Sequence, residues 1–436
     1  MEELMNKNNV ALTPPMGWNS WDCYMSTVTE EQLLEQARYM AAHLKPFGWQ
    51  YIVCDIQWYE PTAGTVPGTE YIPFAKLHMD AYGRLLPAEN RFPSAAFGQG
   101  FAPIARQVHD MGLKFGIHIM RGIPRQAVYA RCPILGTDTT ADAIADPFSI
   151  SKWNGDMFGL RDVPSAQAYY NSLFTLYAEW GVDFVKVDDI ANTNMYPQNP
   201  YAAEREIEMI RSAIDACGRE MVLSLSPGPS VIEKAWHLKR HANMWRMTDD
   251  FWDSWSALLS MFERCEVWQA HVEPGCWPDC DMLPLGRIGV AFGKDRQTSF
   301  TKDEQITMMT LWSIFRSPLM LGGVLSESDD FTLSLITNEE LLRLHAHSYG
   351  AQQHMRNQHE AVWCSHADDG GQYVAMFNLS DAARKLSMDL SDLGISGASV
   401  RDIWAKTAYG TKVMRIETLV PAHGAKLFYV DRYHQA

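Results

Sequence analysis

Apolar and polar residues follow two different periods along the first three quarters of the chain. Short, nearly continuous apolar runs read as buried strands, and longer segments with apolar residues three or four positions apart read as helices. The two kinds of segment alternate, which is the order of a parallel sheet with crossover helices. Strands are predicted at residues 16–21, 51–58, 113–120, 181–190, 220–228, 241–250 and 268–283, helices at 30–44, 100–112, 166–180, 203–217 and 252–265, and a helix followed by a strand at 303–323.

About eight strand-helix units fit before residue 325 or so, and we expect an α/β fold in which they close into a (β/α)8 TIM barrel. A doubly wound open sheet is the alternative, but no GxGxxG loop follows the first strand. Beyond about residue 340 the pattern changes to short alternating strands separated by turns, which predicts a small antiparallel C-terminal β-sandwich. We therefore expect a barrel with a short N-terminal arm at residues 1–337 and a sandwich at residues 338–436.

Two long segments of the predicted barrel show neither period. Residues 60–93 are rich in proline and glycine, and residues 121–162 read as irregular. Loops of this length in a compact domain are usually either functional or disordered.

Charge and composition narrow the classes of partner. The chain of 436 residues has a net charge of −15 and no basic cluster, which argues against binding to nucleic acid or to anionic membranes. The N-terminal residues show no signal-peptide pattern, and no apolar run reaches about 18 residues. We therefore expect a cytoplasmic protein, and the sequence leaves the oligomeric state open.

The cysteines do not predict a metal site. All eight are scattered, and in a large chain without a secretion signal they read as reduced thiols. Cys276 and Cys280 are close in sequence, but no CxxC pair or nearby His-x-x-x-His pair completes a zinc site. We expect no structural metal there.

The end of the strand at residues 181–190 carries the clearest chemical signal. Lys186 and Asp188 are two positions apart, so on a strand they point to the same side. In a parallel barrel the carboxyl ends of the strands face the active site. An ammonium group beside a carboxylate favours the ionised acid, which is the form that a carboxylate nucleophile needs. The alternative is a strand-end ion pair without chemistry, because structural ion pairs also perturb acids.

Polar residues also stand at or just beyond the ends of other predicted strands. They are Asp55, His118, Ser226, Arg246, Asp249, Asp250, Asp279 and Asp281. In a barrel they would converge on one face, together with Trp21, Trp58 and Trp277, which read either as ligand walls or as core. Carboxylates bind hydroxyl groups and aromatic faces pack on C–H patches, so this combination suits a sugar.

Paired carboxylates, one ionised and one protonated, are the requirement of glycoside hydrolysis. Asp188 suits the nucleophile, and the acid/base must come from another strand, where Asp250 and Asp249 are the candidates. The alternative for this stretch is a helix start, in which Thr248, Asp249 or Asp250 caps the following helix.

Eight short motifs occur in a fixed order along the chain. They are TPPMGWNSW, YIVCDIQW, RFPS, GLKFGI, DFVKVD, WRMTDDFWDSW, WPDCDML and LWSIFRSPLMLG. In this order the set resembles glycoside hydrolase family 27, the family of α-galactosidases and α-N-acetylgalactosaminidases. The resemblance covers the whole chain and implies a (β/α)8 barrel, a C-terminal β-sandwich, a retaining double-displacement mechanism and no metal or organic cofactor.

The resemblance also implies roles for individual residues. Asp188 matches the nucleophile of the Lys-x-Asp strand, and Asp250, four residues after Arg246, matches the acid/base. Positions that line the sugar subsite in the family match Trp21, Asp55, Lys186, Arg246, Asp281 and Met282.

Three positions depart from the galactosidase pattern. Galactosidases carry two adjacent aspartates that read the 4- and 6-hydroxyls, and this chain has Asp55 followed by Ile56. His118 replaces a common tyrosine, and Ser226 replaces a glutamate and resembles the N-acetylgalactosaminidases. With His118 and Ser226 counted as substrate-binding, we expect cleavage of terminal α-galactosides or α-N-acetylgalactosaminides. The alternatives are a glycosidase for β-L-arabinopyranosides or isomaltose-type glucosides, or a catalytically silent carbohydrate-binding relative.

Overall fold

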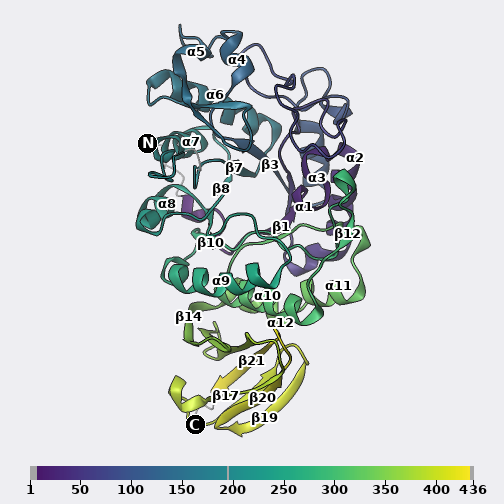
Figure 1. Cartoon of the computed structure of the whole chain (residues 1–436), viewed down its shortest axis with the longest axis vertical. Helices are drawn as coiled ribbons and strands as arrows, with labels where there is room; N and C mark the ends of the chain where they lie inside the picture. The colour runs from purple at the N-terminus through teal and green to yellow at the C-terminus, as the bar shows by residue number, and fades with distance from the viewer. Residues whose placement is uncertain (1–6, 194–195, 433–436) are drawn as a thin grey trace. The chain divides into compact units, whose positions relative to one another are not determined.

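The computed structural model describes residues 7–193 and 196–432. Eight parallel strands form one sheet in the order β10-β9-β8-β7-β3-β2-β1-β13. Figure 1 labels β1, β3, β7, β8 and β10 of this sheet. An isolated parallel bridge joins Leu283, just beyond β10, to Leu321 on β13, so the two edges of the sheet approach each other. The predicted (β/α)8 barrel is confirmed. Its strands are β1 (Met16–Asn19), β2 (Tyr51–Cys54), β3 (Lys114–Met120), β7 (Phe184–Asp188), β8 (Val222–Leu225), β9 (Met244–Arg246), β10 (Trp277–Asp279) and β13 (Leu319–Leu321).

The barrel strands are short and almost entirely buried, which explains why they read as continuous apolar runs in the sequence. The helices between them begin and end with local signals. Thr29 and Gln32 form a capping box at the start of α2, and α6 begins at Pro164 and ends before Gly181, which has a positive φ of 82°. Outside residues 121–162, the α-helices of the described part of the chain are α1 (Trp21–Tyr24), α2 (Glu30–Tyr39), α3 (Ala102–Asp110), α6 (Pro164–Trp180), α7 (Glu204–Ala216), α8 (Ala235–His241), α9 (Trp255–Trp268), α10 (Lys302–Phe315), α11 (Asp330–Ile336) and α12 (Glu339–His347).

The sequence predicted an irregular loop between β3 and α6, and this prediction is wrong. The segment holds a three-stranded antiparallel sheet in the order β4-β6-β5, with two short helices. These elements are too short to show a period, and only the first residue of β5 is buried. They are β4 (Ile123–Pro124), α4 (Arg125–Tyr129), α5 (Ala141–Ile144), β5 (Ala145–Ile150) and β6 (Met157–Leu160). A small hairpin, β11 (Arg287–Ile288) and β12 (Arg296–Gln297), follows β10.

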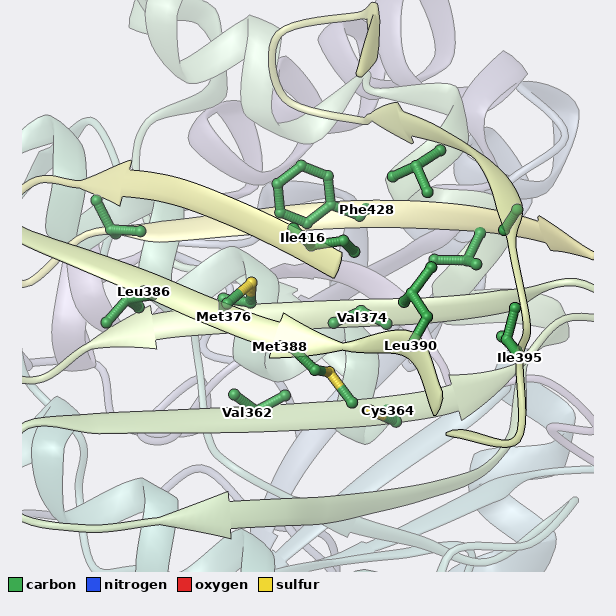
Figure 2. Close-up of a cluster of buried hydrophobic side chains, with 14 residues drawn as sticks. Val362, Cys364, Val374, Met376, Leu386, Met388, Leu390, Ile395, Ile416 and Phe428 are labelled. Atoms are coloured by element: carbon green, nitrogen blue, oxygen red, sulfur yellow. The ribbon is translucent and has the colours of Figure 1, made fainter. Parts of the chain in front are cut away.

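The C-terminal strands are antiparallel throughout, as expected for a β-sandwich. Six form a sheet in the order β14-β15-β16-β21-β18-β19, and β17 pairs with β20. Figure 2 shows the apolar core of this region, in which Val374, Met376 and Phe428 lie with Leu386 and Ile416. The strands are β14 (Tyr349–Arg356), β15 (Glu360–His366), β16 (Gln372–Asn378), β17 (Arg384–Asp389), β18 (Ala398–Asp402), β19 (Thr407–Val413), β20 (Arg415–Val420) and β21 (Ala425–Arg432).

Packing divides the chain into two compact units. The first comprises residues 1–250, 273–297 and 319–328, and the second comprises residues 251–272, 298–318 and 329–436. All eight barrel strands belong to the first unit, whereas α9 and α10 group with the C-terminal strands. The domain boundary predicted at residue 337 lies where the sequence pattern changes. It does not coincide with the division into two packed units, because residues 251–272 and 298–318 belong to the second unit. No helix in the described ranges is both long and apolar enough to cross a bilayer.

Candidate active site

A pocket of about 290 Å³ opens at the carboxyl ends of the barrel strands. Asp55 and Ile56 follow β2, Lys186 and Asp188 end β7, and the acidic pair after β9 closes the other side. The side chains that line the pocket are Trp21, Asp55, Ile56, Glu70, Tyr71, Trp153, Lys186, Asp188, Pro227, Asp249 and Asp250.

The strongest charge pair in this pocket joins two strands. Lys186 Nζ lies 3.0 Å from Asp55 Oδ2, which also accepts a hydrogen bond of 2.8 Å from Asn19 Nδ2. Asp55 Oδ1 accepts a further bond from the amide of Ile56. Burial alone would raise the pKa of Asp55, but Lys186, His118 and these hydrogen bonds outweigh it and lower the pKa below its usual value. Asp55 is therefore a fixed, ionised acceptor, and it, rather than Asp188, is the hydrogen-bonded partner of Lys186.

Asp188 is held by a different side chain. Its Oδ2 lies 3.0 Å from Nε2 of His118, and its Oδ1 accepts a bond of 2.8 Å from the amide of Asp189. Burial would raise the pKa of Asp188, but the hydrogen bond and charge of His118, together with Lys186, lower it. The buried carboxylate is thus kept ionised at neutral pH and faces the pocket. That is the state required of a nucleophile.

Arg246 on β9 forms ion pairs with two further acids, Asp250 and Asp281. Its Nη2 lies 3.1 Å from Asp250 Oδ1, and its Nη1 lies 2.8 Å from Asp281 Oδ1. Arg246 is buried, whereas the Asp250 side chain is 55% exposed and lines the pocket. The alternative that Thr248, Asp249 or Asp250 caps the next helix is wrong, because Ser254 caps α9 by accepting a hydrogen bond from the Ala257 amide.

A second, much smaller cavity of about 20 Å³ lies among the barrel strands, and Lys186 lines both spaces. Ser226, Arg246, Asp281 and Met282 line this cavity and not the larger pocket. All ten predicted site residues are therefore gathered at one end of the barrel, five on the pocket, four on the cavity, and His118 bonded to Asp188. Their individual roles stay predictions.

Loop residues complete the pocket, and sequence reasoning did not name them. The Tyr71 ring stacks on Trp21, with centroids 6.4 Å apart and planes 11° apart, and lies 5.5 Å from Trp153. Tyr71 and Trp153 also line a neighbouring apolar groove of about 580 Å³, next to Phe74 and Tyr129. The only signal for them was the length of the loops that carry them.

Two tryptophans predicted near the mouth do not line the pocket. Trp58 and Trp277 are fully buried, and their indole N–H groups donate to the carbonyls of His118 and Ala11. They belong to the core, which is the usual place for large aromatic residues.

Carboxylates and one lysine line the pocket, but they do not form a metal-ligand set. Within the described part of the chain, one group of His, Cys, Asp or Glu has ligand atoms close enough to share an ion, and it consists of Glu208, His237 and His241. None of these residues lines the pocket. The site therefore offers acid, base and hydrogen-bonding chemistry.

A (β/α)8 barrel whose strand ends present acidic side chains beside aromatic walls defines the class of barrel enzymes that act on carbohydrates. Comparison with known proteins makes this specific. A family model described as alpha galactosidase A matches residues 157–346, and a model for the alpha galactosidase C-terminal beta sandwich domain matches residues 358–430.

A β-L-arabinopyranosidase from Geobacillus stearothermophilus, assigned to glycoside hydrolase family 27, is 53% identical, covers 100% of both chains and superposes with a TM-score of 0.95. A Bacillus halodurans protein provisionally assigned as an α-N-acetylgalactosaminidase is 51% identical over 96% of this chain and 97% of its own, with a TM-score of 0.86. Alpha-galactosidase 2 from Arabidopsis thaliana is 24% identical over 98% of this chain and 92% of its own. The protein belongs to glycoside hydrolase family 27 and is a glycoside hydrolase.

Proposed function

We propose that the protein is a retaining exo-glycosidase that removes terminal β-L-arabinopyranosyl residues. The observation that carries this proposal is that the apolar residue Ile56 lines the pocket. Its side chain lines the pocket directly beside Asp55, at the place where galactosidases have the second aspartate of the pair that reads the 4- and 6-hydroxyls. The 53% identity to a β-L-arabinopyranosidase supports the same choice among the alternatives.

The chemistry of the two sugars explains why one residue matters. β-L-Arabinopyranose has the ring configuration of α-D-galactopyranose but lacks the hydroxymethyl group on C5. Asp55, ionised and held by Lys186, can accept hydrogen bonds from ring hydroxyls that both sugars share. The apolar side chain of Ile56 cannot accept a bond from a 6-hydroxyl, and a buried hydroxyl without a partner costs about 1–3 kcal/mol. The pocket therefore favours the sugar without that group.

In this proposal Asp188 and Asp250 divide the chemistry. A carboxylate oxygen of Asp188 attacks the anomeric carbon while Asp250 gives its proton to the departing glycosidic oxygen. Asp250 then takes a proton from water, and the water oxygen displaces Asp188 from the sugar. Arg246, 3.1 Å from Asp250, offsets the charge on Asp250 between the two steps. A retaining mechanism requires the two carboxyl groups to stand about 5–5.5 Å apart.

An α-galactosidase or α-N-acetylgalactosaminidase is the second candidate, and it rests on the relatives that carry these names and on Ser226. Ser226 is buried and lines the 20 Å³ cavity rather than the pocket. A cavity of that size holds about one water molecule. The position of Ser226 therefore gives little support to an N-acetyl group at C2 of the substrate.

A panel of nitrophenyl glycosides tests the proposal. We expect kcat/KM on the β-L-arabinopyranoside to exceed that on the α-galactoside by about tenfold or more, with less activity on the α-N-acetylgalactosaminide and α-glucoside. NMR of the first-formed product should show the anomer of the substrate. Asp188→Ala should lose about 10⁴-fold in kcat and still bind arabinose. Faster cleavage of the α-galactoside would contradict the assigned sugar, and an inverted product would contradict the mechanism.

A further inference from the structure

Two helices outside the active-site pocket present a matched set of acids and histidines. Glu204 and Glu208 on α7 are four positions apart, and so are His237 and His241 on α8, so each pair lies on one helix face. The ligand atoms of Glu208, His237 and His241 all lie within 4.8 Å of one another. Two elements thus bring three side chains of the kinds that bind transition metals to one point.

The distances suit a tetrahedral ion. His237 Nε2 lies 3.3 Å from Glu208 Oε1, and the rings of His237 and His241 have centroids 4.3 Å apart. A Zn²⁺ ion with ligands at about 2.0–2.1 Å holds neighbouring ligand atoms roughly 3.3 Å apart. Glu204 Oε1, 3.9 Å from His237 Nε2, stands where a fourth ligand could come from. Small side-chain adjustments would be enough to close the site.

Neighbouring groups orient these side chains as outer-shell partners orient metal ligands. The Tyr201 hydroxyl lies 2.9 Å from Nδ1 of His237 and fixes the ring with Nε2 toward the acids. Arg205 pairs with Oε2 of Glu208, and Lys234 lies 2.7 Å from Oε2 of Glu204. In each glutamate the Oε1 atom is the one turned toward His237.

Both imidazoles are of the kind that binds transition metals, because the neutral ring carries the lone pair that a metal requires. His237 is almost fully buried between the two helices.

We propose that Glu208, His237 and His241 bind one Zn²⁺ ion, which ties α7 to α8 and has no part in catalysis. Two imidazoles and one carboxylate suit Zn²⁺ and similar first-row metals, and do not suit Mg²⁺, which prefers oxygen ligands. The ion would stabilise the first compact unit, because it binds the folded arrangement of the two helices.

Calorimetric titration of the full, EDTA-treated chain tests this site. We expect one Zn²⁺ per chain with a Kd of about 10 μM or tighter, no binding of Mg²⁺, and a rise of a few degrees in Tm with Zn²⁺. Co²⁺ should give visible absorption from a four-coordinate site. Glycosidase activity should be the same with Zn²⁺ and with EDTA.

Variants locate the ion. His241→Ala and Glu208→Gln should each weaken Zn²⁺ binding by about tenfold or more and remove the Co²⁺ absorption, and Tyr201→Phe should weaken binding less. His354→Ala, an exposed histidine in another part of the chain, is the matched control and should bind like wild type. Unchanged Zn²⁺ affinity in folded His241→Ala, or no Zn²⁺ binding by the wild-type chain, would overturn the proposal.

Discussion

At the scale of single residues, the pocket is organised by which nitrogen group bonds to which carboxylate. Lys186 bonds to Asp55 and His118 bonds to Asp188, so each of these buried acids has its own partner. Asp188 is therefore stabilised without a hydrogen bond to Lys186, the residue that bonds to Asp55. The pH dependence of activity should therefore respond to His118.

His118→Asn removes the charge next to Asp188, and the pKa of Asp188 should rise toward or above its usual value of 3.8. Asp188 acts as the ionised form, so the acidic limb of the kcat/KM profile should lie below about pH 4 in wild type and move to higher pH in the variant. Activity should thus fall at pH 4–5 and change least near pH 7.

The matched control for this change is His109→Asn. His109 pairs with Asp183 and does not line the pocket. The acidic limb of the kcat/KM profile of His109→Asn should coincide with that of wild type. If the limb also stays in place in His118→Asn, then His118 does not hold the charge of Asp188.

Ile56→Asp tests the specificity assigned to the pocket. A carboxylate at this position can accept a hydrogen bond from a 6-hydroxyl, worth about 1.5–3 kcal/mol for a charged acceptor. The ratio of kcat/KM for the α-galactoside to that for the β-L-arabinopyranoside should therefore rise by about tenfold or more. Stability should fall, because the new carboxylate is buried beside Asp55.

Ile56→Leu keeps the volume and the apolar character, and its substrate ratio should remain that of wild type. An Ile56→Asp variant that folds, cleaves both glycosides and keeps the wild-type ratio would contradict the assigned role of Ile56.

How far the sequence predicts the site depends on where each residue stands. Asp188, Lys186 and Asp250 lie at strand ends, and the parallel barrel brings all strand ends together, so their meeting could be expected. The sequence could not predict which nitrogen group bonds to which acid. Asp55, His118 and Lys186 come from three neighbouring strands, and their pairing depends on the three-dimensional positions of the side chains. Tyr71 and Trp153 come from long segments whose path no local pattern determines.

At the scale of elements, the sequence predicts buried strands better than exposed ones. The eight barrel strands are apolar because both of their faces are covered, and all were found. In the sandwich, β14 and β19 are the two edges of the six-stranded sheet and are mostly exposed. Without a buried face they show no alternation of apolar and polar residues. The small sheet between β3 and α6 was missed because its strands are short and only the first residue of β5 is buried.

That small sheet matters because the segment joining β5 to β6 carries Trp153. Trp153 lines both the pocket and the apolar groove, so we expect it to contact the leaving group of a glycoside bound in the pocket. Trp153→Ala should raise KM for aryl glycosides about three- to tenfold, the value of one aromatic contact, with a smaller change in kcat. Phe148→Ala, a 79% exposed aromatic on β5, is the matched control and should leave both constants unchanged. A loss confined to kcat would contradict a contact with the leaving group.

At the scale of the whole molecule, the second compact unit joins two parts that lie far apart in the sequence. Helix α10 is buried on nearly all sides, and along the chain it lies between the hairpin β11–β12 and the barrel strand β13. Within this unit, Trp404 Nε1 donates to Thr310 Oγ1 at 2.9 Å, Thr307 donates to the carbonyl of His423, and His423 Nδ1 lies 2.9 Å from Glu304. The C-terminal strands therefore complete the surroundings of α10.

A chain that ends at residue 337, the boundary suggested by the sequence pattern, should consequently not give a stable enzyme. It would expose the apolar face of α10 and leave polar groups such as those of Thr310 and Glu304 without their partners, at a cost of several kcal/mol. We expect the truncated chain to be largely insoluble and without glycosidase activity. Trp404→Phe is a graded control that removes one hydrogen bond, and it should remain soluble and active with a Tm lower by only a few degrees. A soluble truncated chain with wild-type kcat/KM would mean that α10 is stable without the C-terminal strands, and that the sandwich is a separate module added to a self-sufficient barrel.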